Sequence, residues 1–202
     1  MITEFLTVAM DSESLYKVKG SKFIGLVFPV STTEEIRRRL GKVRQDYHDA
    51  HHYCYAYVLG AEKLDYRVND DGEPNHSAGD PILGQVRANN LTNVLVIVVR
   101  YFVGAKLGVR GLINAYRAAA AEALNNAMFK TEEITKKVVI YYNYSSTNSI
   151  MRLIDDFKLV VIDQTFDSRC KLIAQVKLGN KAAVEAKLNL LKETGYDLYF
   201  EK

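Results

Sequence analysis

The arrangement of the first part of the chain depends on the stretch Val98-Val99-Arg100-Tyr101-Phe102-Val103-Gly104-Ala105-Lys106-Leu107-Gly108-Val109-Arg110-Gly111-Leu112. Its start continues a β-branched run that predicts a buried strand over residues 94–102. The strand then breaks into a glycine-rich loop that carries two cations. A long alanine-rich helix is expected to follow over residues 110–129. The stretch therefore predicts a strand, a loop and a helix in immediate succession.

A second junction of this kind precedes it, in the stretch Asp70-Asp71-Gly72-Glu73-Pro74-Asn75-His76-Ser77-Ala78-Gly79-Asp80-Pro81. Carboxylates, glycines and prolines here form a loop, and a helix is expected over residues 77–90. Compact domains commonly bind an anion, a metal or a partner at such loop-to-helix junctions.

The remaining elements of residues 1–133 are of mixed type. Strands are expected over residues 6–10, 22–30 and 53–59, and an amphipathic helix over residues 32–47. Helices follow strands without a strict alternation. The pattern therefore favours an α+β layered sheet over a doubly wound parallel one.

Residues 134–202 contain the elements of a complete small domain. Strands are expected over residues 138–144, 159–166, 171–178 and 196–200, and helices over residues 145–157 and 181–192. Ser145 or Ser146 is the expected cap of the first helix. The order βαββαβ is that of a ferredoxin-like domain. We therefore predict two domains, 1–133 and 134–202.

Bulk properties restrict the class of protein. The chain has 202 residues, of which 48% are hydrophobic, and a net charge of +3. No apolar run reaches the roughly 20 residues that a membrane-spanning helix needs. The N-terminus has no signal-peptide pattern, and Cys54 and Cys170 are expected to be free and buried. We expect a cytoplasmic protein with no membrane association and no cofactor, and the oligomeric state stays open.

Several motifs resemble those of the IMPACT/YigZ family: residues 20–24 (GSKFI), residues 50–57 (AHHYCYAY) and the two junctions quoted above. The resemblance implies a first domain similar to domain 2 of ribosomal protein S5. It implies a second domain similar to a C-terminal domain of elongation factor G. The eukaryotic relative regulates translation but carries a different partner domain. This chain departs from the family pattern at Val103 and Arg110, where glycines are usual.

The glycine-rich loop is a candidate anion site. Gly104, Gly108 and Gly111 allow close backbone approach, and a helix N-terminus offers unpaired N–H groups. Lys106 and Arg110 would add counter-charge. The spacing matches neither a P-loop nor a dinucleotide fingerprint. The alternative interpretation is a turn that only packs against its neighbour.

The acidic loop allows two interpretations. Its carboxylates could hold a hard cation, or they could accept backbone N–H bonds, with Asp80 as helix cap before Pro81. An arginine that ends a buried strand needs a carboxylate, so Arg100 is expected to pair with Glu73 or Asp71. That pairing would join both loops in one site.

The function predicted from the sequence is a non-catalytic, translation-linked regulator that binds RNA, the ribosome or a translation factor. One alternative is a metal- or anion-dependent enzyme acting on a small phosphorylated or peptide substrate. Another is a pure protein-interaction module. No metal ligand is assigned. The predicted binding residues are Asp70, Asp71, Gly72, Glu73, Pro74, His76, Arg100, Tyr101, Gly104, Lys106, Gly108, Arg110 and Gly111.

Overall fold

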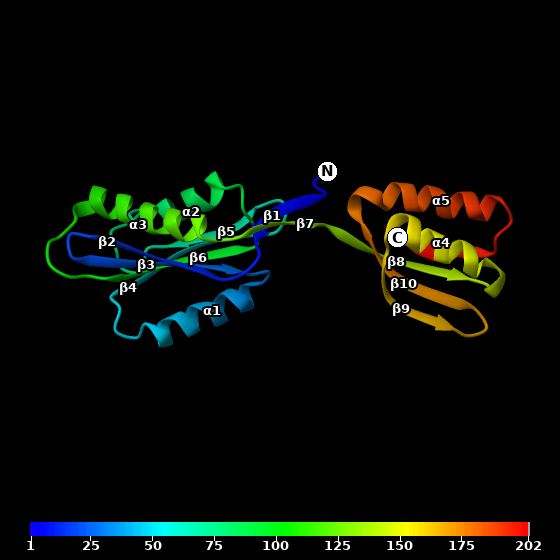
Figure 1. Cartoon of the computed structure of the whole chain (residues 1–202), viewed down its shortest axis with the longest axis horizontal. Helices are drawn as coiled ribbons and strands as arrows, with labels where there is room; N and C mark the ends of the chain where they lie inside the picture. Colours follow the sequence, from blue (N-terminus) through cyan, green and yellow to red (C-terminus); the bar gives the residue numbers. More distant parts are fainter. Residues whose placement is uncertain (202) are drawn as a thin grey trace. The chain divides into compact units, whose positions relative to one another are not determined.

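The computed structural model describes residues 1–201, which form two compact units. The larger unit is Glu4–Glu132. The smaller unit comprises Met1–Thr3 together with the residues from Glu133 onward. Both units mix helices and strands, as expected for the α+β class (Figure 1).

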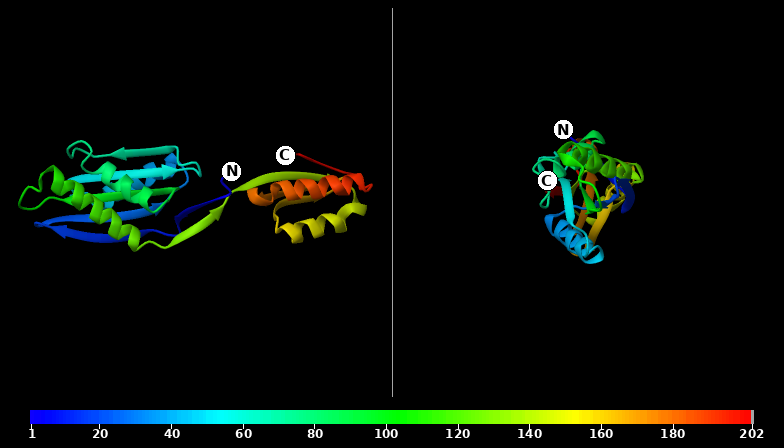
Figure 2. Two further views of the ribbon diagram at one scale, coloured as in Figure 1. Left: turned by 90° about the horizontal axis from the view of Figure 1, so that it is seen from above. Right: turned by 90° about the vertical axis from the view of Figure 1, so that its left-hand side faces the viewer.

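The larger unit is built on a five-stranded antiparallel sheet in the order β2-β3-β6-β4-β5. Helix α1 covers one face, and α2 and α3 cover the other (Figure 2). A separate pair of strands, β1 and β7, forms a two-stranded sheet. The elements are β1 (Glu4–Val8), β2 (Ser12–Val18), β3 (Ser21–Pro29), α1 (Thr33–Asp46), β4 (His52–Leu59), β5 (Asp65–Asn69), α2 (Gly79–Ala88), β6 (Val94–Tyr101), α3 (Gly108–Asn125) and β7 (Phe129–Glu133).

Strand β6 is central because its alternate side chains fill both cores. Val94, Val96 and Val98 face α2 and α3, whereas Leu95 and Ile97 face α1. The same alternation places Arg100 on the side of α2 and α3 and Tyr101 on the side of α1. Buried apolar residues on both faces explain the continuous hydrophobic run in the sequence.

Three sequence-based expectations for this unit were wrong in detail. The edge strands β2 and β5 were not expected, because their largely exposed residues show no clear apolar period. Helix α3 begins two residues earlier than expected, at Gly108, and ends at Asn125. Phe129 starts β7 instead, next to the Met128 carbonyl that accepts a hydrogen bond from the Ala9 N–H.

The smaller unit has the expected βαββαβ order of elements. Its four strands form an antiparallel sheet in the order β11-β8-β10-β9. Helices α4 and α5 pack against one face, through residues such as Ile150, Leu153 and Leu188. The elements are β8 (Thr135–Tyr142), α4 (Thr147–Phe157), β9 (Val160–Phe166), β10 (Cys170–Lys177), α5 (Lys181–Glu193) and β11 (Leu198–Glu201).

The start of α4 differs from the expected serine cap. Ser146 occupies the N-cap position, as one of the two expected residues, but its hydroxyl makes no capping bond. The hydroxyls of Ser145 and Ser146 both donate to Oδ1 of Asn143, at 2.6 and 2.8 Å. A short 3₁₀ turn, Tyr144–Ser146, leads into α4. The two cysteines are free and buried, as expected, one in each unit.

Candidate functional site

Asp70 caps helix α2 from a distance. Its Oδ1 accepts hydrogen bonds from the backbone N–H groups of Ala78 and Gly79, at 2.9 and 2.8 Å. Its Oδ2 accepts a third from the N–H of His76, at 2.9 Å. The expected cap, Asp80, contacts Nδ1 of His76 instead, at 2.5 Å. The prediction of Asp80 as the cap was wrong because Asp70 caps the helix instead. The Asp70 carboxylate reaches the start of α2 across the folded loop.

Asp71 links the same loop to helix α1 and strand β4 through hydrogen bonds. Its Oδ1 accepts a bond from Nη2 of Arg44 on α1 (2.8 Å), and its Oδ2 accepts one from the N–H of Tyr53 on β4 (2.7 Å). Asp71 and Gly72 have φ values of 42° and 85°, so the chain turns sharply here. His52 Nδ1 donates to the Asp71 carbonyl oxygen at 2.9 Å.

Glu73 forms the buried centre of the site. Its Oε1 accepts hydrogen bonds from Nη1 of Arg100 at 2.5 Å and from the hydroxyl of Tyr116 at 2.7 Å. Nε2 of His52 lies 3.8 Å from the same oxygen. Only 4% of the Glu73 side chain and 6% of the Arg100 side chain are exposed. Arg100 therefore pairs with one of the two carboxylates that the sequence suggested, and the pair links the two loop junctions.

Burial also controls the two weak acids beside Glu73. Cys54 Sγ lies 3.3 Å from the Tyr116 hydroxyl. Burial raises the pKa of the Cys54 thiol well above its ordinary value, and it raises the pKa of the Tyr116 hydroxyl in the same way. Both groups are neutral at physiological pH. The cluster therefore has one carboxylate, balanced by one guanidinium.

Arg100 retains an unused donor. Its guanidinium lies over the rings of Phe23 and Phe102, 5.4 and 5.2 Å from their centroids. Its Nε is buried and has no hydrogen-bond partner anywhere in residues 1–201. A buried donor without an acceptor costs about 1–3 kcal/mol.

Arg100 lines a pocket at the start of α3, which we call the α3 pocket. Its volume is about 320 Å³. Its lining residues are Glu73, Pro74, Arg100, Phe102, Lys106, Leu107, Gly108, Val109 and Leu112. The pocket therefore has mostly apolar walls, with one ion pair and one exposed lysine.

The first turn of α3 leaves its backbone donors open. The capping position is Leu107, which has no polar side chain, and the turn contains no acidic residue. Gly108 has φ +71°, a conformation that suits glycine. The first four N–H groups of a helix lack internal partners and concentrate partial positive charge. The α3 pocket therefore combines helix N–H donors with two cationic side chains, Lys106 and Arg100.

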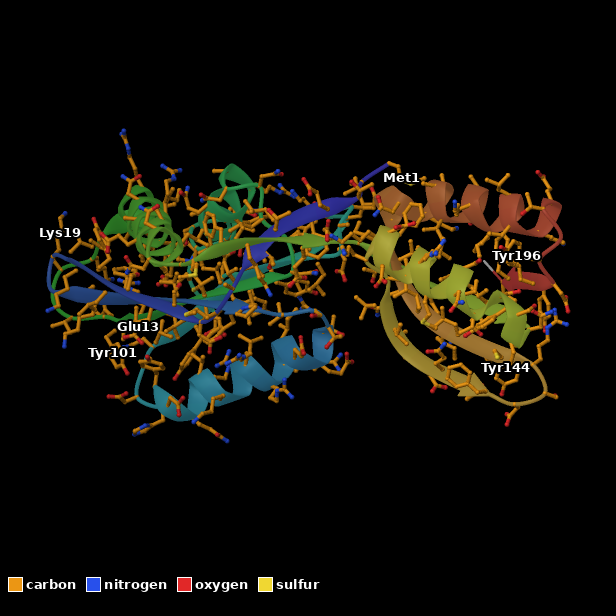
Figure 3. All side chains as sticks on the ribbon, turned by 45° about the vertical axis from the view of Figure 1, so that its right-hand side comes forward. Met1, Glu13, Lys19, Tyr101, Tyr144 and Tyr196 are labelled. Atoms are coloured by element: carbon orange, nitrogen blue, oxygen red, sulfur yellow. The ribbon has the colours of Figure 1, made fainter. Side chains whose placement is uncertain are left out.

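The loop before α3 lies at the same end of the larger unit as the β2–β3 turn. A Cβ placed on Gly20 would lie 3.0 Å from the Val103 carbonyl oxygen, so the two segments are in contact. Figure 3 shows Lys19 and Tyr101 at this end. The Tyr101 hydroxyl donates to Oδ1 of Asp49 at 2.8 Å. Burial and this bond raise the pKa of Tyr101 to about 12.

The structure brings together only part of the predicted binding set. Glu73, Pro74, Arg100, Lys106 and Gly108 line the α3 pocket. The residues outside it are Asp70, Asp71, Gly72, His76, Tyr101, Gly104, Arg110 and Gly111.

Arg110 is the clearest departure from the predicted anion site. It is exposed on the first turn of α3 and does not line the pocket. Neither the apolar wall nor Tyr116 was predicted from the sequence. Tyr116 belongs to the buried stripe of α3, which is the signal that could have revealed it.

The acidic side chains of the first loop do not converge on one point. Asp70 faces the N-terminus of α2, Asp71 faces Arg44, and Glu73 faces Arg100. Within the described residues no three His, Cys, Asp or Glu side chains are grouped as metal ligands would be. The loop is therefore organised by protein hydrogen bonds and ion pairs.

The basic face of α1 is largely paired as well. Arg39 binds Asp11 at 2.8 Å, Arg44 binds Asp71 at 2.8 Å, and Lys42 binds Asp46 at 2.8 Å. These ion pairs neutralise much of the positive charge on this face of α1.

The part of the chain that contains the site matches a known protein family. Residues 19–124 match the Impact N-terminal domain. The chain belongs to the IMPACT family. The match includes both loop junctions and every residue that lines the α3 pocket.

Several IMPACT family members resemble the chain in sequence. It is 36% identical to IMPACT family member YvyE of Bacillus subtilis over 126 residues, which cover 62% of this chain and 58% of that protein. It is 27% identical to IMPACT family member YigZ of Escherichia coli over 174 residues, or 85% of each. The match thus spans little more than half of the Bacillus relative.

One solved structure covers both units. It is described as the crystal structure of a hypothetical protein, and it matches 98% of this chain and 97% of its own with a TM-score of 0.74 and 25% identity. No helix within residues 1–201 is long and apolar enough to span a bilayer.

Proposed function

We propose that this IMPACT family member is a non-catalytic, translation-linked RNA-binding protein that holds one nucleotide of RNA in the α3 pocket. The observation that carries the proposal is Arg100, a residue that lines the pocket and whose buried Nε has no hydrogen-bond partner in the described part of the chain. A phosphate oxygen is the acceptor that a guanidinium and a helix N-terminus both favour.

The walls of the pocket favour a nucleotide over a bare anion. Phe102, Leu107 and Leu112 provide an apolar surface, and the α3 N–H groups and Lys106 lie at the same pocket. A nucleotide has both parts, a flat base and an anionic phosphate. A volume of about 320 Å³ lies at the lower end of the range for small-ligand pockets.

The cluster behind the pocket supports binding rather than catalysis. The Glu73 carboxylate already accepts bonds from Arg100 and Tyr116. The pKa values of Cys54 and Tyr116 are raised by burial, so neither supplies an anionic nucleophile near neutral pH. The polar side chains of this cluster therefore hold one another in place behind the pocket.

We also propose the finer fold assignments and the cytoplasmic location. The larger unit would correspond to a domain like domain 2 of ribosomal protein S5, within residues 1–133. The smaller unit would be a ferredoxin-like domain, within residues 134–202, similar to a C-terminal domain of elongation factor G. The sheet order β11-β8-β10-β9 supports the second assignment.

The test is fluorescence anisotropy of a labelled single-stranded RNA of mixed sequence, titrated with the full chain at several salt concentrations. Lys106 is exposed, so Lys106→Gln should fold normally. We expect it to weaken binding about fivefold and to reduce the slope of log K against log salt by about 0.7. Lys63→Gln is the control, since Lys63 follows the far end of β4 and contacts Asn90.

Two results would overturn the proposal. One is an unmodified chain that shows no salt-dependent RNA binding. The other is a Lys106→Gln variant that binds RNA as the Lys63→Gln control does. Steady conversion of the RNA or of free nucleotides by the unmodified chain would instead support the enzyme alternative.

A further inference from the structure

A second cavity lies on the face of the five-stranded sheet that helix α1 covers. We call it the α1 pocket, and its volume is about 390 Å³. Strands β2 and β3 line one side of it, and α1 lines the other. Leu26, Phe28 and Val43 form an apolar floor, and each is less than 10% exposed. The cavity falls within the size range of pockets that bind small molecules.

Two ion pairs lie at the rim of the α1 pocket. Arg39 donates to both carboxylate oxygens of Asp11, at 2.8 and 3.1 Å. Its guanidinium carbon lies over the Phe28 ring, 4.8 Å from the centroid. Nζ of Lys42 lies 2.8 Å from Oδ1 of Asp46. Each cation has its own carboxylate, so these two pairs give the pocket no net charge.

Glu13, which also lines the pocket, is a carboxylate without a cation. The neighbouring Ser14 faces α3, because its hydroxyl donates to the Ala119 carbonyl at 3.1 Å. Alternation along β2 therefore turns Glu13 toward α1, and its register partner is the apolar Leu26. Within residues 1–201 the Glu13 carboxylate has no hydrogen-bond or ion-pair partner. The α1 pocket thus has one uncompensated negative charge.

The lysines of β2 and β3 lie too far along the strands to neutralise Glu13. Lys17 and Lys22 face the same side of the sheet and pair with each other in register. Four residues separate Lys17 from Glu13, which is about 13 Å of extended strand. Exposed charges are largely screened beyond about 10 Å at 0.1 M ionic strength. Glu13 is therefore available to a cation that enters the pocket.

The Tyr47 side chain adds a polar group to the same end of the pocket. Burial raises the pKa of Tyr47, and the charges of Glu13 and Asp46 raise it further. The hydroxyl is therefore protonated near neutral pH and can accept a hydrogen bond from an ammonium group. The pocket has an anionic and polar end beside an apolar floor.

We infer that the α1 pocket binds a small organic ammonium, with the charged group at Glu13 and the apolar part on the floor. A primary ammonium donates three hydrogen bonds, and the Glu13 carboxylate and the Tyr47 hydroxyl are acceptors for them. The apolar part gains free energy by leaving water. An anionic ligand would be repelled by Glu13. The site lies across the sheet from the α3 pocket, so it goes beyond the proposed RNA binding and can fail without it.

The test is an NMR titration of the ¹⁵N-labelled full chain with phenethylamine near neutral pH, where the amine is protonated. We expect the amide signals of Glu13, Leu26 and Val43 to shift and to saturate with a Kd of about 1 mM, since so small a ligand has few atoms with which to bind. The amide signals of Gly108 and Val109, at the α3 pocket, should stay in place. The uncharged analogue 2-phenylethanol should bind about tenfold more weakly.

Glu13→Gln and Glu62→Gln form a matched pair of variants. Both glutamates are exposed, and Glu62 lies between β4 and β5, at the opposite edge of the sheet from β2. We expect Glu13→Gln to weaken phenethylamine binding about tenfold, because the uncompensated charge is lost. Glu62→Gln should bind within about twofold of the unmodified chain. Equal binding by the two variants overturns the inference.

Lys42→Gln should have the opposite effect. The Lys42 side chain is 67% exposed, so the variant should fold. It leaves Asp46 without its cation, so the pocket gains negative charge and phenethylamine should bind about threefold more tightly. The inference is also overturned if Lys42→Gln leaves binding unchanged or weakens it, or if 2-phenylethanol binds as tightly as phenethylamine. Absence of a saturable shift at Glu13, Leu26 and Val43 up to about 10 mM phenethylamine contradicts it as well.

Discussion

Helices α2 and α3 lie against the same face of the sheet, yet their first turns are completed in opposite ways. Asp70 gives α2 a carboxylate that accepts the N–H groups of Ala78 and Gly79. At α3 the capping residue is Leu107, and no acidic side chain lies in the first turn. The carboxylate-rich loop is therefore a structural cap, and the glycine-rich loop leaves positive potential available to a ligand.

The Glu73–Arg100 pair lies between the two junctions and should give the largest effect. Glu73→Gln leaves a buried guanidinium without its carboxylate, so the free energy of unfolding should fall by about 3 kcal/mol. The same change removes the negative charge from the α3 pocket and should tighten RNA binding. Urea denaturation and RNA anisotropy measure the two effects. Weaker RNA binding by a folded variant would contradict our view of the pocket.

The cap of α2 should give the next largest effect. Asp70→Ala removes three hydrogen bonds to backbone N–H groups and should lower the free energy of unfolding by about 2 kcal/mol. Asp80→Ala is the control and should cost less than about 1 kcal/mol, because its partner His76 is exposed. Equal losses in urea denaturation would restore Asp80 as the cap.

The Glu73–Arg100 pair and the Asp70 cap show how much of the site could be predicted from the sequence. The Glu73–Arg100 pair was predictable because an arginine that ends a buried strand requires a carboxylate. The reach of Asp70 to Ala78 and Gly79 was not, because it depends on how the intervening turn folds. The side of α3 on which Arg110 lies depends on where the helix begins, and that start was misplaced by two residues.

The helices and strands likewise differ in how well the sequence predicts them. Elements with a strong apolar pattern were predictable from the sequence, as the helical period of α4 and the continuous apolar run of β6 show. Strands β2 and β5 were not, because an edge strand with exposed side chains is held mainly by its neighbour's backbone.

The buried acids beside Glu73 predict an alkaline limit to stability. Cys54 and Tyr116 have raised pKa values in the folded chain, whereas the unfolded chain ionises them near 9.0 and 10.0. Above pH 9 the unfolded state binds fewer protons, so stability should fall by roughly 1 kcal/mol per pH unit. Thermal denaturation from pH 8 to 10.5 measures this. A Cys54→Ala variant should start to lose stability about one pH unit later, near the ordinary pKa of tyrosine; an unchanged profile would contradict the assignment.

The smallest effect on stability is expected from a substitution that gives the α3 junction a carboxylate, as the α2 junction has. Val109 is 53% exposed in the first turn of α3, so Val109→Glu should stabilise the chain by about 0.5 kcal/mol through the helix dipole. The added carboxylate should weaken RNA binding several-fold. Val109→Gln is the uncharged control. RNA binding that is unchanged by Val109→Glu would mean that the open turn is not used.

The most direct test of the α3 pocket is an NMR titration of the ¹⁵N-labelled full chain with single-stranded RNA. The account predicts that the Nε–Hε signal of Arg100 and the amide signals of Gly108 and Val109 shift together and saturate with the RNA. The amides of Ala78 and Gly79, already bound by Asp70, should stay in place. RNA binding that leaves the Arg100, Gly108 and Val109 signals unmoved would contradict the central claim.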